Sequence, residues 1–277
     1  MSGEPGGNYA DVNGLKMYYE IHGEGSPLVV LHGAFMTIGA MGAFVPVLAE
    51  TRRVVAVELQ GHGHTADVDR PLSYEQLADD VAGLVRHLGI ERTDVFGYSL
   101  GGGAAIQLAM RHPELVRKLV VASASTTSDG VYPEVWAGID QITPELFAGS
   151  PWKEEYDRVA PHPDAFPTLV EKMKQLDGQP FAWPPEEIRA ISAPTMVVIG
   201  DSDGTTPEHA VELFRLRGGG VFGDLAGLPD ARLAVLPGTT HVGLVGRAAW
   251  LAPMIDEFLN APMPENDSPV GDGAAPT

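Results

Sequence analysis

Residues 95–103, VFGYSLGGG, decide how the rest of the chain is interpreted. A β-branched and aromatic run ends at Gly97, and a helix-forming run, 104–110, follows the motif. This order of strand, sharp turn and helix places Ser99 at the apex, where its hydroxyl is exposed at the edge of a sheet. Such a turn strains its central residue, so glycine at Gly97 and Gly101 avoids side-chain clashes. The pattern predicts a nucleophilic Ser99; the simpler alternative is a serine in a glycine-rich turn.

The composition limits the classes of protein to which the chain can belong. Its 277 residues, 44% hydrophobic and 20% charged, suffice for one large α/β domain or two small ones. The formal net charge of −19 would repel phosphate backbones and anionic lipids, so we expect neither nucleic acid nor a membrane as a partner. The absence of cysteine excludes disulfides, a thiolate nucleophile and cysteine-ligated metals.

The sequence says less about the cellular location and the oligomeric state of the protein than about its class. The first residues contain neither the basic start nor the apolar run of a signal peptide, and no apolar window reaches about 18 residues. We therefore expect a cytoplasmic protein without a membrane span. A homodimer is an open alternative to a monomer, because no feature of the sequence decides between them.

Short apolar segments alternate with amphipathic helical patterns along most of the chain. The predicted strands are 27–31, 53–58, 94–98, 118–122, 195–199 and 232–236, and the predicted helices are 74–88, 102–111, 207–216 and 247–259. Unbroken apolar strands that alternate with helices indicate a parallel sheet covered on both faces. Two further strands, 9–12 and 15–22, are joined by Asn13-Gly14, which is typical of a type I′ hairpin turn. We therefore predict an α/β fold with a mostly parallel, doubly wound sheet of about eight strands and flanking helices.

Residues 126–193 interrupt this alternation. They are rich in proline and aromatic residues, which favours short helices over strands. One interpretation is a surface insertion with its own small core. The other, which we favour, is a helical lid between the sixth and seventh strands, because long segments at such positions are usually functional. The predicted core then comprises residues 8–125 and 194–260, and residues 261–277 are predicted to be a disordered tail.

A nucleophilic serine needs a base beside it, and that base needs a carboxylate to orient it. Among the nine histidines, His241 follows the last predicted strand in a loop at the carboxyl edge of the sheet, where ligand-facing residues gather. The acid is expected directly after strand 195–199, where Asp201 and Asp203 both stand. Spacing does not separate these two aspartates. The one that does not act would cap the helix that begins near Pro207 or lie in solvent.

Acyl transfer also requires amide donors for the oxygen that becomes negative. The N–H of Leu100, at the start of the helix after the serine, is one candidate. The N–H of Ala34, in the loop after strand 27–31, is the other, with Phe35 close behind it. His32 and the turn at 62–64 are interpreted as structural. Since no metal-binding histidine pattern and no phosphate-binding glycine loop occurs, we expect no metal and no cofactor.

Four segments together resemble the α/β-hydrolase family, in particular its lid-bearing esterases, lactonases and C–C hydrolases. They match the family's oxyanion loop at 32–34, nucleophile elbow at 97–101, acid turn at 200–203 and histidine loop at 238–241. The resemblance implies that Asp203 is the acid, since the family places it fourth in this turn with proline four positions later, here Pro207. It also implies attack on a carbonyl by Ser99, because related dehalogenases and epoxide hydrolases have aspartate there. Glu58 departs from the aspartate that the family commonly shows.

The predicted function is the hydrolysis of a carboxylic ester of a small to medium, largely apolar substrate through an acyl-enzyme. Ser99 is the expected nucleophile, His241 the base and Asp203 the acid that orients it. Apolar side chains of the lid and neighbouring loops are expected to bind the substrate: Phe35, Trp136, Phe147, Trp152, Trp183 and Val242. Each lid aromatic has the alternative role of plain core. Alternative activities of the same site are lactone opening, C–C cleavage and perhydrolysis, and a non-catalytic small-molecule sensor is the remaining alternative.

Overall fold

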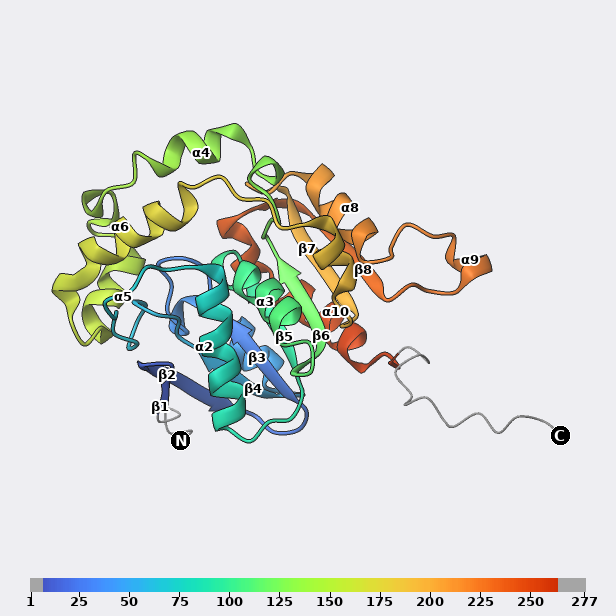
Figure 1. Cartoon of the computed structure of the whole chain (residues 1–277), viewed down its shortest axis with the longest axis horizontal. Helices are drawn as coiled ribbons and strands as arrows, with labels where there is room; N and C mark the ends of the chain where they lie inside the picture. Colours follow the sequence, from blue (N-terminus) through green and yellow to red (C-terminus); the bar gives the residue numbers. More distant parts are fainter. Residues whose placement is uncertain (1–6, 264–277) are drawn as a thin grey trace.

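Eight strands within the described residues, 7–263, form one mixed sheet in the computed structural model (Figure 1). The strands are β1 Asn8–Val12, β2 Leu15–His22, β3 Pro27–Leu31, β4 Arg53–Val57, β5 Thr93–Tyr98, β6 Val116–Ala122, β7 Thr195–Ser202 and β8 Ala231–Thr240. Their spatial order is β1-β2-β4-β3-β5-β6-β7-β8, and every neighbouring pair from β4 to β8 is parallel. The predicted mostly parallel α/β sheet is therefore confirmed.

The antiparallel edge of the sheet is the predicted hairpin. β1 pairs with β2, and β2 pairs with β4, both in antiparallel register. Asn13 and Gly14 join β1 to β2 with φ angles of +48° and +79°, the left-handed pair that a two-residue type I′ turn requires. An asparagine followed by a glycine adopts these angles at little cost, so the local sequence determines this turn.

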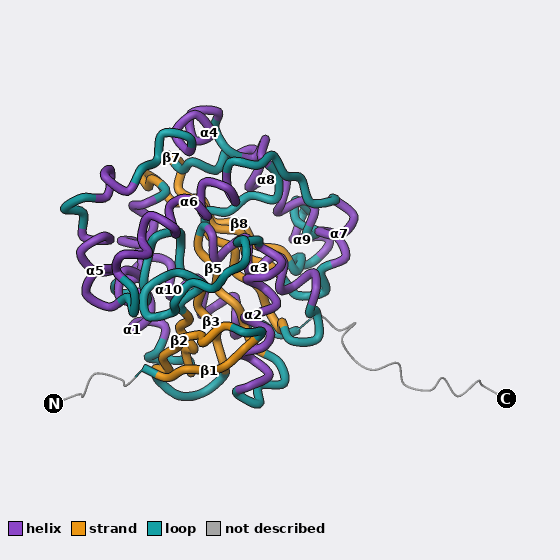
Figure 2. The backbone as a smooth tube through the Cα atoms, turned by 60° about the vertical axis from the view of Figure 1, so that its left-hand side comes forward, coloured by secondary structure: helices purple, strands orange, loops and turns teal. Residues whose placement is uncertain are grey.

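Helices cover both faces of the sheet (Figure 2). On one face lie α2 Tyr74–His87, α3 Leu100–Arg111 and α8 Pro207–Leu216, and on the other lie α1 Phe44–Leu48 and α10 Ala248–Asn260. Two separate buried clusters result, and alternate residues of each central strand enter one cluster or the other: Val29 enters the first and Val30 the second. Burial on both faces is the physical reason for the unbroken apolar strands of the sequence.

The segment between β6 and β7, residues 126–193, is called the insertion below. It folds into the helices α4 Pro133–Ile139, α5 Pro151–Val159, α6 Phe166–Asp177 and α7 Pro185–Ala190, and α4, α5 and α6 lie at the upper left of Figure 1. Proline in the first turn of each helix explains how so proline-rich a segment becomes helical. Phe166 and Val170 of α6 belong to the same buried cluster as Val81 of α2. The insertion therefore shares its apolar core with the sheet.

The structure differs from the sequence prediction mainly at the ends of elements. β7 and β8 continue to Ser202 and Thr240, beyond their predicted ends, because the backbones go on pairing after the apolar run stops. The five-residue helix α1 was not predicted, since it contains Pro46 and is too short for a periodic pattern. The remaining short helices are α9 Gly223–Ala226 and the 3-10 turns η1 Gly39–Met41, η2 Ser128–Gly130, η3 Pro144–Phe147, η4 Pro163–Ala165 and η5 Val242–Arg247.

The two ends of the chain lie outside this description. Residues 1–6, on which the prediction of no signal peptide rests, and residues 264–277, most of the predicted disordered tail, are not among the described residues. None of the helices within residues 7–263 has the length and apolar character of a membrane-spanning helix.

Candidate active site

Ser99 occupies the turn between β5 and α3 with a φ of +53° and a ψ of −116°. A non-glycine residue adopts such angles only where its surroundings impose them. A β-carbon at Gly97 would lie 2.1 Å from the carbonyl oxygen of Gly101, and one at Gly101 would lie 2.5 Å from that of Leu31. The turn therefore closes only with glycine on both sides of the serine, which is the packing reason for the motif.

The imidazole of His241 connects Ser99 to a carboxylate. His241 Nε2 lies 3.0 Å from Ser99 Oγ, and His241 Nδ1 lies 2.7 Å from Asp203 Oδ1. An ionised carboxylate only accepts hydrogen bonds, so the proton belongs on Nδ1, and Nε2 is left to accept from the serine hydroxyl. The three residues directly follow β5, β7 and β8, at the carboxyl edge of the parallel strands. The structure thus brings together the three side chains that the sequence singled out.

Asp203 is buried, but several donors support its charge. Burial by itself raises the pKa of the carboxyl; hydrogen bonds from His241, Ser123 and the N–H of Thr205 outweigh it and hold the pKa below its usual value. Ser123 directly follows β6 and has a φ of +53°. Asp203 therefore stays ionised at neutral pH, which is the state that orients and stabilises a protonated imidazole.

Asp201, the competing aspartate, stabilises the path of the chain toward His241. Its carboxylate accepts hydrogen bonds from the N–H groups of Gly238 and Thr239, at 2.9 and 3.1 Å. Of the two roles expected for the second aspartate, capping the following helix is wrong, because the Thr206 hydroxyl caps α8 by accepting from the N–H of His209. Asp201 is exposed to solvent, which was the other expected role. Spacing along the sequence left both aspartates open, and the distances to His241 separate them.

Tyr98 and Ser123 are functional candidates that the sequence reasoning missed. The Tyr98 hydroxyl donates to the carbonyl oxygen of His241 at 2.8 Å, so it restrains the backbone of the histidine loop. The sequence does place Tyr98 beside Ser99, and it places Ser123 at the end of β6, on the same sheet edge. Neither position tells which way the side chain points, so the sequence alone could not assign these residues to the site.

Two residues whose backbone amides have no partner among the described residues line the same cavity as Ser99. Within residues 7–263 the N–H groups of Leu100 and Ala34 donate no hydrogen bond, and both residues line the cavity at Ser99. Leu100 is the first residue of α3, where N–H groups have no helical partner and the helix dipole favours negative charge. Phe35, next to Ala34, has a φ of +61°, so the loop turns sharply at this point.

His32 and His62 are buried in the core near the loop that contains Ala34. His32 Nε2 accepts from the N–H of Leu59 at 3.1 Å, and Nδ1 lies 2.7 Å from the carbonyl oxygen of Gly33. Burial lowers the pKa of His32 to about 3 and that of His62 to about 4, so both rings are neutral at pH 7. In the described part of the chain, no group of three or more histidine, cysteine or acidic residues is arranged to hold a metal ion.

A cavity of about 560 Å³ opens beside Ser99 and His241. Five of the six residues predicted to bind substrate line it: Phe35, Trp136, Phe147, Trp152 and Val242. Trp183 does not line it, because it packs behind two aromatic residues that do, with ring centroids 5.5 Å from Tyr74 and 5.4 Å from Phe181. Most of the cavity wall is apolar, and its insertion-derived part comes from α4, α5, the end of α6 and the segments between them.

The charged groups of this cavity are acidic. Glu134 and Asp177 line it, and no lysine or arginine of the described residues does. Two bases of the insertion bind acidic groups elsewhere: Lys172 binds the carboxylate of Asp67 at 2.6 Å, and Arg158 binds that of Glu155 at 2.7 Å. The cavity therefore provides no permanent positive charge for a strongly anionic substrate.

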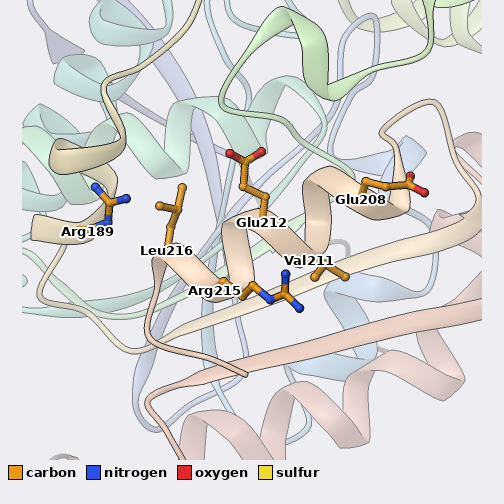
Figure 3. A pocket seen from close by; sticks show the side chains of 6 residues that line it. All are labelled: Arg189, Glu208, Val211, Glu212, Arg215 and Leu216. Atoms are coloured by element: carbon orange, nitrogen blue, oxygen red, sulfur yellow. The ribbon is translucent and has the colours of Figure 1, made fainter. Parts of the chain in front are cut away.

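A second, shallower hollow lies between α7 and α8 (Figure 3). Its volume is about 300 Å³, and Arg189, Glu208, Val211, Glu212, Arg215 and Leu216 line it. It shares no residue with the cavity at Ser99, and four of its six lining residues are charged. None of these six lining residues is a serine or a histidine, so the hollow does not repeat the arrangement at Ser99.

Comparisons with known proteins agree with the fold. A 2-hydroxymuconate semialdehyde hydrolase of Pseudomonas sp. (strain CF600) is 33% identical over 133 residues, which are 47% of this chain and 46% of that protein. A pimeloyl-(acyl-carrier protein) methyl ester esterase of Aeromonas hydrophila subsp. hydrophila is 27% identical over 275 residues, which are 88% of this chain and 100% of that protein. The crystal structure of the enol-lactonase from Burkholderia xenovorans LB400 superposes with a TM-score of 0.69 at 25% identity, covering 92% of this chain and 100% of that one.

These similar proteins are named for different reactions, so the comparisons are compatible with more than one activity. The match to a family model extends over most of the chain, from residue 28 to residue 254, and includes Ser99, Asp203 and His241. The family described by that model is the alpha/beta hydrolase family, and the chain belongs to it.

Proposed function

We propose that the protein is a serine hydrolase that cleaves carboxylic esters of small to medium, largely apolar substrates. The observation that carries this proposal is the hydrogen-bonded series from Ser99 Oγ through His241 to Asp203, with distances of 3.0 and 2.7 Å, at the wall of a mostly apolar cavity. A hydroxyl, a neutral imidazole and an ionised carboxylate in this order are what nucleophilic acyl transfer requires.

The first half of the proposed reaction forms an acyl-enzyme. His241 Nε2 takes the proton of Ser99 while Ser99 Oγ bonds to the ester carbonyl carbon, and the carbonyl electron pair moves onto its oxygen. The N–H groups of Leu100 and Ala34 donate to that oxygen, because neither has a partner among residues 7–263 and both residues line the cavity. The oxygen then re-forms its double bond, the alkoxide leaves, and His241 returns the proton to it.

The second half releases the acid. Water loses a proton to His241 Nε2 and bonds to the acyl carbon, and the same amides stabilise the negative oxygen. The bond to Ser99 Oγ breaks, and His241 gives the proton back to the serine. Asp203 keeps Nδ1 protonated in both halves, so Nε2 remains the atom that exchanges protons.

The substrate class follows from the cavity. A volume of about 560 Å³ lies within the range of small-molecule sites, and aromatic side chains such as Trp136, Phe147 and Trp152 favour an apolar acyl or alcohol group. The lack of lysine and arginine among the described lining residues argues against substrates with several negative charges.

The test is an ester chain-length series assayed with the wild type and Ser99→Ala side by side. We expect hydrolysis of short and medium p-nitrophenyl esters by the wild type and a loss of more than about 10³-fold in Ser99→Ala. A fluorophosphonate probe should label the wild type and not the variant. Turnover by Ser99→Ala at the wild-type rate would end the proposal, and labelling of Ser99 without any turnover would favour a small-molecule sensor.

A lactone is the second candidate substrate, supported by the likeness to the enol-lactonase over nearly the whole chain. A lactone is a cyclic ester, so the same residues would open it with the same proton movements. A panel that compares matched esters, lactones and vinylogous diketones separates the candidates. A kcat/KM for lactones or diketones far above that for every ester would replace the ester proposal.

A further inference from the structure

We propose that Asp177 is a specificity-determining residue of the cavity. It selects substrates that carry a hydrogen-bond donor, such as a hydroxyl, several bonds away from the scissile carbonyl. It disfavours substrates that carry a carboxylate at the same position. The inference rests on the proposed function, in that the substrate is held with its carbonyl at Ser99. It adds a polar requirement to a site that otherwise recognises apolar groups.

Asp177 is the last residue of α6 and lines the cavity together with Tyr74 and Phe181. Its Oδ1 accepts a hydrogen bond from the Tyr74 hydroxyl at 3.2 Å. Its Oδ2 accepts no hydrogen bond from any residue in the described range 7–263. One carboxylate oxygen is thus held by the protein, and the other is available to a molecule in the cavity.

The protein does not neutralise this carboxylate. Among the described lining residues only His241 can become positive, while Glu134 adds a second acid at the same cavity. Burial raises the pKa of Asp177 to about 6, and the negative end of the α6 dipole acts in the same direction. Above that pH the carboxylate is charged, and the protein replaces only part of the hydration that it has lost. A hydrogen-bond donor of the substrate therefore binds this carboxylate favourably.

The position of Asp177 relative to Ser99 defines where the donor must lie. Its partner Tyr74 packs against Gly103, where a β-carbon would lie only 2.3 Å from the Tyr74 ring. Gly103 is one turn of α3 beyond Ser99, about 6 Å along the helix axis. A substrate with its carbonyl at Ser99 can therefore extend one arm along α3 toward the Tyr74–Asp177 pair, several bonds away.

The experiment compares three p-nitrophenyl esters of one length: hexanoate, 6-hydroxyhexanoate and the mono-ester of adipic acid. Each is assayed at pH 8 with the wild type, Asp177→Leu and Asp177→Asn, and with Glu171→Gln as a matched control on the exposed side of α6. A second set, butyrates of 1-hexanol and 1,6-hexanediol, puts the donor on the alcohol arm and shows which arm Asp177 meets.

For each set we compare the kcat/KM of the hydroxylated ester with that of the plain ester. Asp177→Leu should lower this ratio by about tenfold or more in one of the two sets. Asp177→Asn retains an acceptor oxygen, so it should keep most of the hydroxyl ratio while it improves the adipate ester relative to hexanoate by about tenfold. Equal ratios in the wild type, Asp177→Leu and Glu171→Gln, in both sets, would overturn the inference.

A binding measurement keeps this result separate from the fate of the proposed function. Trp136 and Trp152 line the cavity, so tryptophan fluorescence reports occupancy in Ser99→Ala without turnover. In that background, 1,8-octanediol should bind more tightly than 1-octanol with Asp177 present and lose this advantage in the Asp177→Leu double variant. Diol selectivity that depends on Asp177, without ester turnover by the wild type, would sink the esterase proposal and leave the Asp177 inference standing. Ester turnover by the wild type without diol selectivity that depends on Asp177 would overturn only the inference.

Discussion

At the scale of single residues, the site depends on the protonation of two carboxyl groups, the buried Asp203 and the half-buried Asp177. Asp203 receives four hydrogen bonds, from His241, Ser123 and the N–H groups of Thr205 and Gly200, and its pKa stays low although it is buried. Asp177 receives one, and burial raises its pKa to about 6. Two carboxyls that both line or adjoin one cavity thus differ in protonation because they differ in the number of donors that reach them.

Asp203→Asn should lower kcat by about 10⁴-fold on the ester that the wild type cleaves, because an amide supports the wrong imidazole tautomer. Asp201→Asn is the matched control, since Asp201 lies two positions earlier and binds backbone amides instead of His241. Its effect should be smaller by at least about tenfold. Steady-state kinetics on both variants check this, and a larger loss in Asp201→Asn would contradict the assignment of the acid.

Asp177 should make the stability of the protein depend on pH in a defined window. Its usual pKa of 3.8 applies to the unfolded chain, and the folded value is about 6. Between these values the native state binds a proton that the unfolded chain releases, so the stability falls as the pH rises from about 4 to about 6. Asp177→Asn lacks this titration. Its stability relative to the wild type should therefore increase by about 2–3 kcal/mol between pH 4 and pH 7.5.

Denaturant unfolding of both proteins at the two pH values measures this change. Every other titrating group that is unaffected by the substitution cancels in the comparison of the two proteins. The same stability difference at pH 4 and at pH 7.5 would show that the folded pKa of Asp177 is not raised.

At the scale of elements, the position of Ser99, the proposed nucleophile, depends on how closely α3 approaches β3 and β5. The carbonyl oxygens of Leu31 and Gly101 occupy the space that side chains at Gly101 and Gly97 would need. The helix therefore begins directly after the serine, and its first residue, Leu100, lines the cavity. The same close approach creates both the strain at Ser99 and the amide donor beside it.

Gly101→Ala should destabilise the protein by about 3 kcal/mol, because the added methyl meets backbone that cannot move as a side chain can. Gly138→Ala in α4 is the matched control, since a β-carbon there meets no atom within 4 Å. It should stabilise by about 0.5–1 kcal/mol through the better helix propensity of alanine. Thermal unfolding of both variants gives the comparison. Equal stability of Gly101→Ala and the wild type would show that the elbow is less tightly packed than the structure indicates.

At the scale of the whole molecule, buried ion pairs connect the sheet to the last helix. Asp94 of β5 is fully buried between Arg52, at 3.3 Å, and Arg117. Arg52 also reaches Asp256 of α10, and Arg117 donates to the carbonyl oxygen of Leu259. The group lies at the end of the sheet opposite to Ser99, because Asp94 is near the start of β5 and Ser99 directly follows its end.

Asp94→Asn should cost about 3 kcal/mol or more in unfolding free energy, since it leaves two guanidinium groups with less counter-charge in a buried setting. Asp79→Asn is the exposed counterpart: its pair with Arg111 is partly open to solvent and should contribute less than about 1 kcal/mol. Chemical denaturation measures both. Because the group is remote from the site, kcat of the folded Asp94→Asn protein should stay within about threefold of the wild type. A stability equal to that of Asp79→Asn would contradict this role.

The sequence by itself determined what depends on neighbours along the chain. The turn at Asn13-Gly14, the alternation of buried strands with helices and the elbow around Ser99 are each encoded within a few residues, so local sterics and burial predicted them. The order serine, aspartate, histidine likewise pointed to three loops on one sheet edge. Proline at helix starts explains why residues 126–193 could be predicted as a helical insertion.

Only the tertiary structure decided what depends on distance through space. Asp201 and Asp203 are two positions apart in sequence, yet one contacts backbone amides and the other contacts His241, because the bulge between β7 and β8 turns them in different directions. Trp183 lies behind the cavity wall and Asp177 lies in it, although both come from the insertion. Chain folding brings α6, α2 and α3 together at that wall, and no spacing rule within one segment contains that information.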